Sequence, residues 1–394
     1  MSKLDDLIHE LCPNGVEFKK IKEEFNRLKG TPITASKMKE IQNDNGEIRI
    51  FAGGRTVIDS FEKDIPKANI TRVPAVLVQS RGVIDVVYYD KPFTFKNEMW
   101  AYTHKNKVSV KYLYYVLKSN IEKFREVASG MGSLPQISLK VTEDFLVPLP
   151  PLPVQEEIVR ILDNFTELTA ELTAELTARK KQYEYYRDEL LRFGKNVEIQ
   201  PLKLICDVRD GTHDSPKKSI EGKYLVTSKN IKGGKVDFNN CYKISEVDYY
   251  EINKRSKVDK NDLLFTMIGT IGEVALVENE PDYAIKNIGL IKSNNPLLSK
   301  YLKYLLNSNY TKNYINNNKS KGSQSFLALG KLRDMPIPLL PVKEQQRIVD
   351  ILDRFDKLCN DISEGLPAEI EARQKQYEYY RDKLLTFKPL EEVK

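Results

Sequence analysis

Lys181-Gln-Tyr-Glu-Tyr-Tyr-Arg-Asp188 returns unchanged as Lys375-Gln-Tyr-Glu-Tyr-Tyr-Arg-Asp382, and this repeat decides the fold. A second block, residues 147–165, returns with substitutions as residues 337–355. The octapeptide copies lie 194 positions apart and the second pair of blocks 190, so the second copy carries four additional residues between its blocks. A duplication on this scale predicts a chain of two similar halves.

Fainter echoes precede the blocks. Gly30-Thr31 returns as Gly211-Thr212, and Lys96-Asn97 returns as Lys286-Asn287. Tyr112-Leu113 similarly resembles Tyr301-Leu302. The order predicted from these echoes is variable domain, helix, variable domain, helix.

Each helical segment follows a proline-rich stretch, residues 148–153 or 336–341, which disfavours helix upstream. In the first segment the apolar residues have the three-and-four spacing of an amphipathic helix. They are Ile158, Ile161, Leu162, Phe165, Leu168, Leu172 and Leu176. The pattern predicts a helix from Gln155 to Phe193, ended by Gly194 and about 55–60 Å long.

A long helix with one apolar stripe needs a partner, and the second helical segment is the natural one. Chain connectivity makes this pair antiparallel. Gly365-Leu366-Pro367 interrupts the second segment, because proline cannot continue the hydrogen-bond ladder, so we expect a kink or break there.

The predicted fold class is therefore α+β, with two α/β-mixed domains separated by an antiparallel pair of long helices in a pseudo-two-fold dumbbell. The expected parts are a first domain at 1–147, a central helix at 148–194, a second domain at 195–336 and a C-terminal helix at 337–394. Strands are expected at 75–79, 83–89, 262–266 and 273–277, with short helices near 112–125 and 301–314.

Composition permits a nucleic-acid partner without requiring one. The 394 residues carry a formal net charge of +6, which a solvated lysine-rich surface would explain equally well. The four cysteines include no Cys-x-x-Cys pair, which argues against a zinc ribbon and favours a reducing cytoplasm. No apolar run approaches the roughly 20 residues that span a membrane.

The sequence lacks the usual catalytic motifs. It contains no Gly-x-x-x-x-Gly-Lys-Ser/Thr phosphate loop, no Gly-x-Gly-x-x-Gly motif and no Asn/Asp-Pro-Pro-Tyr/Phe motif of amino methyltransferases. His9, His104 and His213 are isolated and are interpreted as ordinary surface or core residues. No catalytic residue and no metal ligand is predicted. Two alternatives stay open, a self-contained Mg-dependent DNA nuclease and a coiled-coil scaffold without sequence preference.

The proline-preceded helices, the repeated octapeptide and the tandem Thr169-Ala-Glu-Leu172 and Thr173-Ala-Glu-Leu176 units resemble the specificity subunit of type I restriction–modification systems. The resemblance covers essentially the whole chain. It implies a noncatalytic, cytoplasmic subunit with two target-recognition domains, each reading one half of a gapped, asymmetric site in double-stranded DNA.

The resemblance also implies partners. The helices would set the gap and dock two copies of a methyltransferase subunit, and nuclease–translocase subunits could join. This chain would bind no cofactor, whereas the partners would use S-adenosylmethionine, ATP and Mg. The repeated helix surfaces support such docking independently, because two similar faces present two equivalent sites.

The Thr-Ala-Glu-Leu units suggest a ruler. Each unit adds four residues, which is about 6 Å of helix and only about 40° of rotation beyond a full turn. DNA rises about 3.4 Å per base pair, so one unit should shift the tolerated gap by about one or two base pairs.

Polar and basic side chains of the variable domains are the candidate DNA contacts, because such groups read base edges and hold phosphates. In the first domain they are Arg49, Arg55, Gln79, Arg81, Ser133 and Gln136. In the second they are Lys217, Lys218, Lys229, Asn230, Lys254, Arg255, Lys321, Ser323 and Gln324. The candidate partner-docking residues are Gln155, Tyr185, Gln345 and Tyr379.

Overall fold

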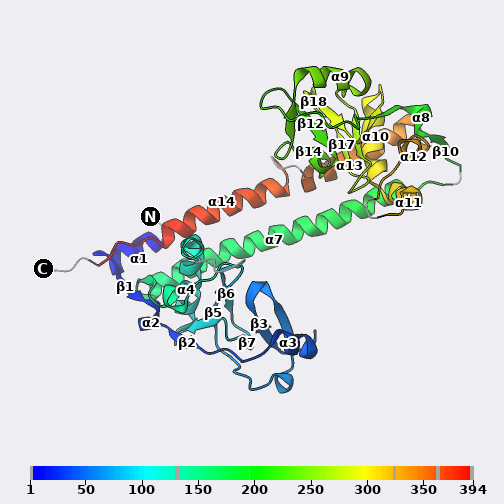
Figure 1. The fold of residues 1–394 in the computed structure, drawn as a ribbon. Coiled ribbons are helices and arrows are strands. Elements are labelled where there is room, and N and C mark those ends of the chain that lie inside the picture. The colour runs from blue at the N-terminus through cyan, green and yellow to red at the C-terminus, as the bar shows by residue number, and fades with distance from the viewer. Residues whose placement is uncertain (1–2, 129–133, 195, 323–324, 361–363, 391–394) are drawn as a thin grey trace. The chain divides into compact units, whose positions relative to one another are not determined.

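The computed structural model describes residues 3–128, 134–194, 196–322, 325–360 and 364–390 (Figure 1). The chain divides into two compact units. Unit 1 combines residues 1–171 with 371–394, and unit 2 comprises residues 172–370. Each unit mixes strands and helices, as the predicted α+β class requires. The boundary between them cuts the long helix after Glu171, so each unit contains part of that helix.

The described residues of unit 1 begin with a short helix and form nine strands. Its strands are β1 (Glu17–Lys20), β2 (Asn26–Leu28), β3 (Ile48–Phe51), β4 (Val57–Ser60), β5 (Ala75–Gln79), β6 (Asp85–Tyr89), β7 (Phe93–Phe95), β8 (Trp100–Thr103) and β9 (Leu146–Leu149). Its helices before the long one are α1 (Lys3–Leu11), α2 (Ile21–Glu24), α3 (Ala35–Ile41), η1 (Gly53–Arg55), η2 (Glu62–Asp64), α4 (Lys107–Ser119), α5 (Ile121–Glu126) and α6 (Leu139–Glu143).

Unit 2 repeats this plan with one added hairpin. Its strands are β10 (Glu198–Pro201), β11 (Asp207–Asp210), β12 (Lys223–Thr227), β13 (Ile231–Lys232), β14 (Lys235–Val236), β15 (Tyr242–Ile244), β16 (Leu263–Thr266), β17 (Val274–Leu276), β18 (Tyr283–Lys286), β19 (Ile288–Lys292) and β20 (Pro336–Leu339). Its helices are α8 (Leu202–Ile205), η3 (Ser228–Asn230), α9 (Glu246–Ser256), α10 (Pro296–Asn307), α11 (Asn309–Asn318), α12 (Leu329–Arg333) and α13 (Val342–Asn360). The four strands expected from sequence are confirmed with small shifts in their ends, whereas each expected short helix is a pair of consecutive helices, α4 with α5 and α10 with α11.

The sheets of the two units have the same topology. The four-stranded sheet has the order β2-β8-β5-β6 in unit 1 and β11-β19-β16-β17 in unit 2. The three-stranded sheets are β4-β3-β7 and β15-β12-β18, and in each the last pair is parallel. The added hairpin of unit 2 is β13-β14.

One glycine in each unit permits a close approach between neighbouring segments. A Cβ atom on Gly30 would lie 2.4 Å from the Phe95 carbonyl oxygen, and one on Gly211 would lie 2.4 Å from that of Ile285. The following residues, Thr31 and Thr212, form matching parallel bridges to Lys96 and Lys286. Two of the echoes seen in the sequence are thus the same junction built twice.

The core of each unit is completed by a helix packed on the four-stranded sheet. Tyr112 and Leu113 of α4 are fully buried, as are Tyr301 and Leu302 of α10. A second tyrosine on each helix ties it to the repeated helical block. The Tyr115 hydroxyl donates to Asp163, and the Tyr304 hydroxyl donates to Asp353.

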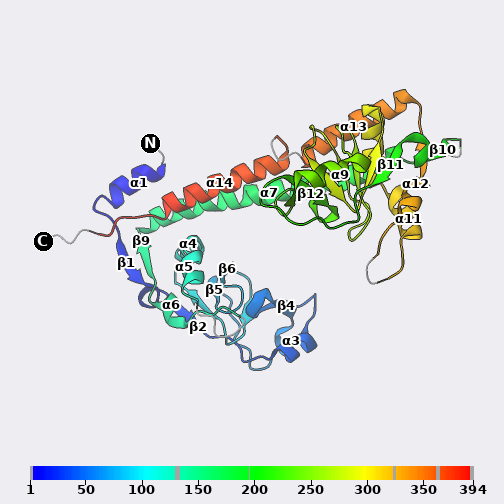
Figure 2. The same ribbon diagram turned by 45° about the horizontal axis from the view of Figure 1, so that its top comes forward.

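The long helix α7 (Leu152–Leu190) is continuous over 39 residues. It ends three residues before the predicted Phe193, and Gly194 accepts a hydrogen bond from Val197 beyond the helix. In unit 1, α7 and α14 (Leu366–Leu384) run side by side in opposite directions, with Phe165 stacked on Tyr380 at 5.6 Å (Figures 1 and 2). In unit 2, Tyr186 stacks on Phe355 of α13 at 5.6 Å. Helix α13 ends at Asn360, and Pro367 lies in the first turn of α14, where its missing N–H has no helical partner to lose.

Candidate nucleic-acid interface

Unit 2 has a polar cleft beside the ends of β12 and β18. Its volume is about 640 Å³, and its walls come from η3, the turn after β16 and the segment after β18. The structure brings three sequence-predicted residues together here, Lys218, Lys229 and Asn230. The other lining residues are Thr227, Ser228, Asn240, Tyr242, Ile268, Gly269, Thr270, Lys286 and Asn287.

The cleft is basic. The Lys218 ammonium lies 5.5 Å from the centre of the Tyr242 ring, Lys229 is exposed, and Lys286 donates to the Ser215 hydroxyl. Three ammonium groups beside amide and hydroxyl groups suit a ligand that presents both phosphates and polar base edges.

Asn230 has a structural role within this cleft. It is only 3% exposed, and its Oδ1 accepts hydrogen bonds from the Thr227 backbone N–H (2.9 Å) and hydroxyl (2.8 Å). Its Nδ2 donates to the Asp237 carbonyl oxygen at 3.3 Å. The side chain shapes the turn at η3, which leaves Lys229 as the outward residue.

The same position in unit 1 is formed by η1 and the turn after β5. A Cβ atom on Gly82 would lie 3.8 Å from the Gly54 Cα, so these two segments are adjacent. Arg81 and Gln136, both predicted contacts, are exposed and form a backbone bridge. The equivalent bridge in unit 2 joins Ile268 to Phe326.

Two predicted residues of unit 1 are engaged inside the fold. Gln79 is 4% exposed at the end of β5. The Arg49 guanidinium donates to both carboxylate oxygens of Asp59 (2.8 and 3.0 Å) and lies 5.5 Å from the Tyr89 ring centre. The hydrogen bond from Arg49 lowers the pKa of the Asp59 carboxyl.

Four predicted contacts of unit 2 lie outside its cleft. Lys217 and Lys321 are exposed, Lys254 pairs with Glu251 at 2.5 Å, and Arg255 pairs with the buried Asp210. Ser133, Ser323 and Gln324 lie outside the described residues, as does the side chain of Arg55.

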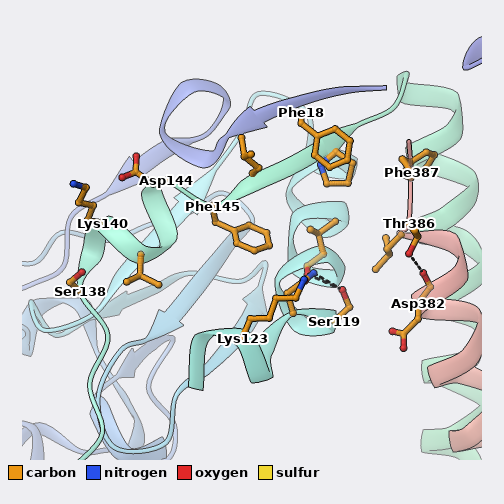
Figure 3. Close-up of a pocket in the computed structure, with 16 residues that line it drawn as sticks. Phe18, Ser119, Lys123, Ser138, Lys140, Asp144, Phe145, Asp382, Thr386 and Phe387 are labelled. Atoms are coloured by element: carbon orange, nitrogen blue, oxygen red, sulfur yellow. Dashed lines mark hydrogen bonds between the residues drawn. The ribbon is translucent and has the colours of Figure 1, made fainter. Parts of the chain in front are cut away.

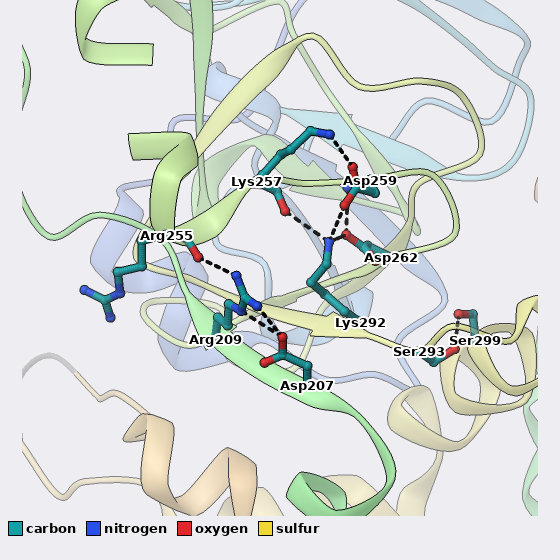
Figure 4. Close-up of polar contacts among 9 residues, drawn as sticks. All are labelled: Asp207, Arg209, Arg255, Lys257, Asp259, Asp262, Lys292, Ser293 and Ser299. Atoms are coloured by element: carbon teal, nitrogen blue, oxygen red, sulfur yellow. Dashed lines mark hydrogen bonds and ion pairs between the residues drawn. The ribbon is translucent and has the colours of Figure 1, made fainter. Parts of the chain in front are cut away.

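An ionic network holds the segment that leads from α9 into β16 (Figure 4). The Lys292 ammonium contacts Asp259 (2.8 Å), Asp262 (2.5 Å) and the Lys257 carbonyl oxygen (3.0 Å). Burial raises the pKa of Asp262, while the hydrogen bond from Lys292 lowers the pKa of Asp259. Arg209 donates to the Arg255 carbonyl oxygen at 3.0 Å, so the end of α9 is attached to β11 as well.

Sequence reasoning missed several residues of the cleft, among them Tyr242, Lys286 and Asn287. A signal for two of them was present. Lys286-Asn287 repeats Lys96-Asn97, and the repetition marks a junction that both units keep.

The two predicted docking glutamines are helix-start residues. Gln155 and Gln345 are 7% and 8% exposed, and each Nε2 donates at 2.8 Å to a carbonyl oxygen five residues earlier, that of Pro150 or Leu340. Both close the turn between the proline-rich stretch and the helix. By contrast, Tyr185 and Tyr379 are 62% and 63% exposed.

A groove lies beside the end of each octapeptide block. Groove 1, of about 850 Å³, runs between the end of α14 and the α4–α5 region of unit 1 (Figure 3). Groove 2, of about 720 Å³, lies between the end of α7 and α11 of unit 2. Asp382, Leu385 and Phe387 line groove 1, and the repeat-related Asp188, Leu191 and Phe193 line groove 2.

Among the described residues, His, Cys, Asp and Glu nowhere gather into a group of three or more that could hold a metal ion. Within the same ranges, every helix is too short or too polar to cross a membrane.

Comparison with known proteins agrees with this geometry. Residues 13–179 and 195–372 each match the type I restriction modification DNA specificity domain. The Escherichia coli type I restriction enzyme EcoR124I/EcoR124II specificity subunit is 37% identical over 304 residues, covering 73% of each chain. The Mycoplasma pneumoniae type I restriction enzyme MpnII specificity subunit is 28% identical over 324 residues, covering 64% of this chain and 92% of the relative.

Solved structures show the same fold. The S subunit of a type I restriction-modification system from M. genitalium aligns with a TM-score of 0.59 at 17% identity, covering 94% of this chain and 96% of that one. A chain from a structure concerned with complex assembly and conformational transition of the type I R-M system aligns with a TM-score of 0.56 at 15% identity, covering 95% and 98%.

Two related domains on one chain, both of the DNA specificity type, define a noncatalytic DNA-recognition subunit. The chain belongs to the family of type I restriction–modification specificity subunits. These relatives support neither alternative, the nuclease or the scaffold without sequence preference.

Proposed function

We propose that each unit reads one half of a two-part site in double-stranded DNA, unit 2 through its cleft and unit 1 through the corresponding region beside η1, with residues 1–147 and 195–336 as target-recognition domains. The observation that carries this proposal is that both units have the same backbone frame but present different side chains beside it. The frame is the junction at which Gly30-Thr31 bridges to Lys96, or Gly211-Thr212 to Lys286. The same junction of Gly-Thr and Lys-Asn borders the unit 2 cleft and the corresponding region of unit 1, whereas Arg81 of unit 1 corresponds in register to Ile268 of unit 2. A common frame with different polar groups suits a site whose halves differ in sequence.

The helical segments, residues 148–194 and 337–394, would set the separation of the half-sites. Leu168, Leu172 and Leu176 of α7 are half-buried at four-residue spacing, while Glu171 and Glu175 are exposed. One Thr-Ala-Glu-Leu unit therefore adds about 6 Å and nearly preserves the apolar face.

The repeated helix ends would dock two methyltransferase subunits, one at groove 1 with Tyr379 and one at groove 2 with Tyr185. Repetition supports this stoichiometry, because each repeated surface carries the same aspartate, leucine, phenylalanine and exposed tyrosine. Nuclease–translocase subunits would join the same cytoplasmic assembly, and the partners would supply S-adenosylmethionine, ATP and Mg.

The half-site reading is tested by silencing each unit separately in the assembled methyltransferase. Lys218→Ala with Lys229→Ala removes two ammonium groups from the unit 2 cleft, and Arg81→Ala with Gln136→Ala alters unit 1. We expect either pair to abolish methylation of the full site, because both halves must be bound together. Lys254→Ala, outside the cleft, is the control. Full-site methylation at the normal rate in both paired variants would contradict the proposal.

The ruler is tested by deleting residues 173–176 and mapping methylated adenines across a genome. The expected result is unchanged half-site sequences with a gap shorter by about one or two base pairs. An altered half-site, or an unaltered gap, would contradict the spacer role.

Docking is tested by Tyr185→Ala and Tyr379→Ala, with the stoichiometry measured by mass photometry or native mass spectrometry. Each variant should weaken one methyltransferase copy, and the double variant both. Tyr250→Ala is a matched control, because Tyr250 is 62% exposed and packs edge-on against its neighbour Tyr249, as Tyr185 does against Tyr186. Two bound copies in the double variant would contradict docking at these residues.

A further inference from the structure

Asn287 is held rigidly at the edge of the unit 2 cleft. It has a positive φ of 54° directly after β18, an uncommon backbone conformation that asparagine tolerates better than most residues. Its backbone N–H donates to the Thr212 carbonyl oxygen at 3.1 Å, and its own carbonyl oxygen accepts from the Ser228 hydroxyl at 3.2 Å. Two other segments therefore fix the position of its Cβ.

The side chain of Asn287 is held by a chain of polar contacts. Its Oδ1 lies 2.9 Å from His213 Nδ1, and His213 Nε2 lies 2.8 Å from Asp210 Oδ2. Asp210 is 4% exposed, and its other oxygen pairs with Arg255. Within the described residues, Asn287 Nδ2 has no hydrogen-bond partner, and Asn287 lines the cleft.

We propose that Asn287 is a base-reading residue of unit 2 and that His213, fixed by Asp210, is the positioning residue that decides which amide atom faces DNA. The proposal rests on the proposed function, in which this cleft contacts DNA. With Oδ1 on the histidine, Nδ2 is presented as a donor and selects an acceptor such as guanine O6 or N7, adenine N7 or thymine O4. With the amide turned, Oδ1 is presented and selects a donor, adenine N6 or cytosine N4.

The proton on His213 couples to this choice. The Asp210 carboxylate accepts from Nε2–H, so Nδ1 can donate to Asn287 Oδ1 only when the ring is doubly protonated. In the neutral ring Nδ1 is an acceptor, and the amide must turn so that Nδ2 donates to it. The charged groups around the ring are Asp210 from β11, Arg255 from α9 behind it, Lys286 from β18 and Asp214 in the same loop.

Unit 1 lacks this arrangement. Alignment of the Thr31 and Thr212 bridges places Lys29 and Pro32 of unit 1 at the positions of Asp210 and His213. Unit 1 does have an asparagine, Asn97, at the position of Asn287. The effects of these residues should be confined to the half-site read by unit 2.

The first experiment measures base preference with the assembled methyltransferase and a duplex library randomised in one half-site at a time. Asn287→Gly removes the amide and accepts the positive φ, and Asn287→Asp replaces the donor by an acceptor. We expect Asn287→Gly to reduce discrimination at one or two adjacent positions by about 10- to 100-fold, and Asn287→Asp to change the preferred base there. The other half-site should be unchanged, and Asn239→Ala, in a neighbouring exposed loop, should match the wild type.

The second experiment isolates His213. His213→Gln replaces the partner of the Asn287 amide and should change the preferred base at the same position by several-fold, with the other half-site unchanged. A purely structural role would instead weaken binding to all sequences equally.

Two results overturn the proposal. One is unchanged base preference in both Asn287 variants, and the other is an equal loss of affinity for every sequence. The paired Lys218→Ala and Lys229→Ala variant distinguishes failure of the proposed function from failure of the Asn287 proposal alone. If it binds DNA normally, the cleft is not the DNA surface and the proposed function fails. If it binds weakly while the Asn287 variants keep their preference, only this proposal fails.

Discussion

The cleft of unit 2 and the corresponding region of unit 1, formed by η1 and the turn after β5, share a backbone frame and differ in the side chains that they present. Each region is bordered by a glycine, Gly30 or Gly211, that allows two backbone segments to approach closely. Each also lies beside a parallel strand pair, β3–β7 in unit 1 and β12–β18 in unit 2. Unit 2 adds a hairpin and the Asp210–His213–Asn287 contacts, whereas unit 1 exposes Arg81 and Gln136. The two units thus share the backbone geometry of these regions, and they differ in the side chains that would contact DNA.

The largest expected effect tests whether the close backbone approach at Gly30 and at Gly211 is equally important for the stability of the two units. Gly30→Val and Gly211→Val would each place Cβ 2.4 Å from a backbone carbonyl oxygen, which neither segment can relieve by a side-chain rotation. We expect each to lower the free energy of unfolding of its own unit by about 3 kcal/mol or more, measured by denaturant titration with probes in each unit.

Gly330→Val is the control for side-chain volume, because a Cβ at Gly330 would meet no atom within 4 Å. If only one of the two frame variants were less stable than this control, the equivalence of the frames would be broken.

A smaller effect compares equivalent positions at the ends of β19 and β8. Lys292→Met leaves the buried Asp262 without its cation and should cost about 3 kcal/mol, less at acidic pH where the carboxyl can bind a proton. Thr103 holds this position in unit 1 and donates to the Pro74 carbonyl oxygen at 2.7 Å, so Thr103→Val should cost only about 1 kcal/mol. Thermal unfolding of both variants checks the ordering, and similar losses would show that the ionic network adds nothing beyond one hydrogen bond.

The smallest effect concerns the two helix starts. Hydrogen bonds from Arg160 and then Lys3 lower the pKa of the buried Glu157 to about 2. A carboxyl with a lowered pKa stabilises the fold above its unfolded-state pKa, and this contribution is lost as pH falls from about 4.5 towards 2. Glu157→Gln should therefore cost about 1–3 kcal/mol at neutral pH and less near pH 2.

The control for this prediction is Glu344→Gln. Glu344 pairs with Arg347 at the second helix start but is well exposed, so its replacement should change stability little at any pH. Equal pH dependence of the two variants would contradict the assignment of the effect to burial.

The helical segments were predictable because their signals are local. Proline stretches, leucine spacing and an identical octapeptide predicted the long helix, although α7 begins at Leu152, three residues before the predicted Gln155. Helix α13 ends at Asn360 and α14 begins at Leu366, so the expected interruption lies beside the predicted Gly365-Leu366-Pro367. The end of α7 was placed three residues late, because the apolar pattern continues through Phe193 after the helix has stopped.

The cleft was less predictable because its members come from segments far apart in sequence. Lys218, Lys229 and Asn230 were chosen for residue type alone, and that criterion cannot separate an exposed lysine from an asparagine used inside a turn. Arg49 and Gln79 show the same difficulty, since ion pairing to Asp59 and burial at a strand end depend on tertiary contacts.

Unit 1 is assembled from both ends of the chain. The Val16 backbone N–H donates to the Lys388 carbonyl oxygen at 2.9 Å, the Leu390 N–H donates to the Val16 carbonyl oxygen at 2.9 Å, and Leu385 is buried in the same core. Unit 2 uses one uninterrupted stretch. During synthesis on the ribosome, unit 1 must therefore wait until residues 371–390 have emerged, while unit 2 can fold once residue 370 has emerged. A premature stop shortly after residue 370 would leave unit 2 complete but would remove from unit 1 the segment that begins at residue 371.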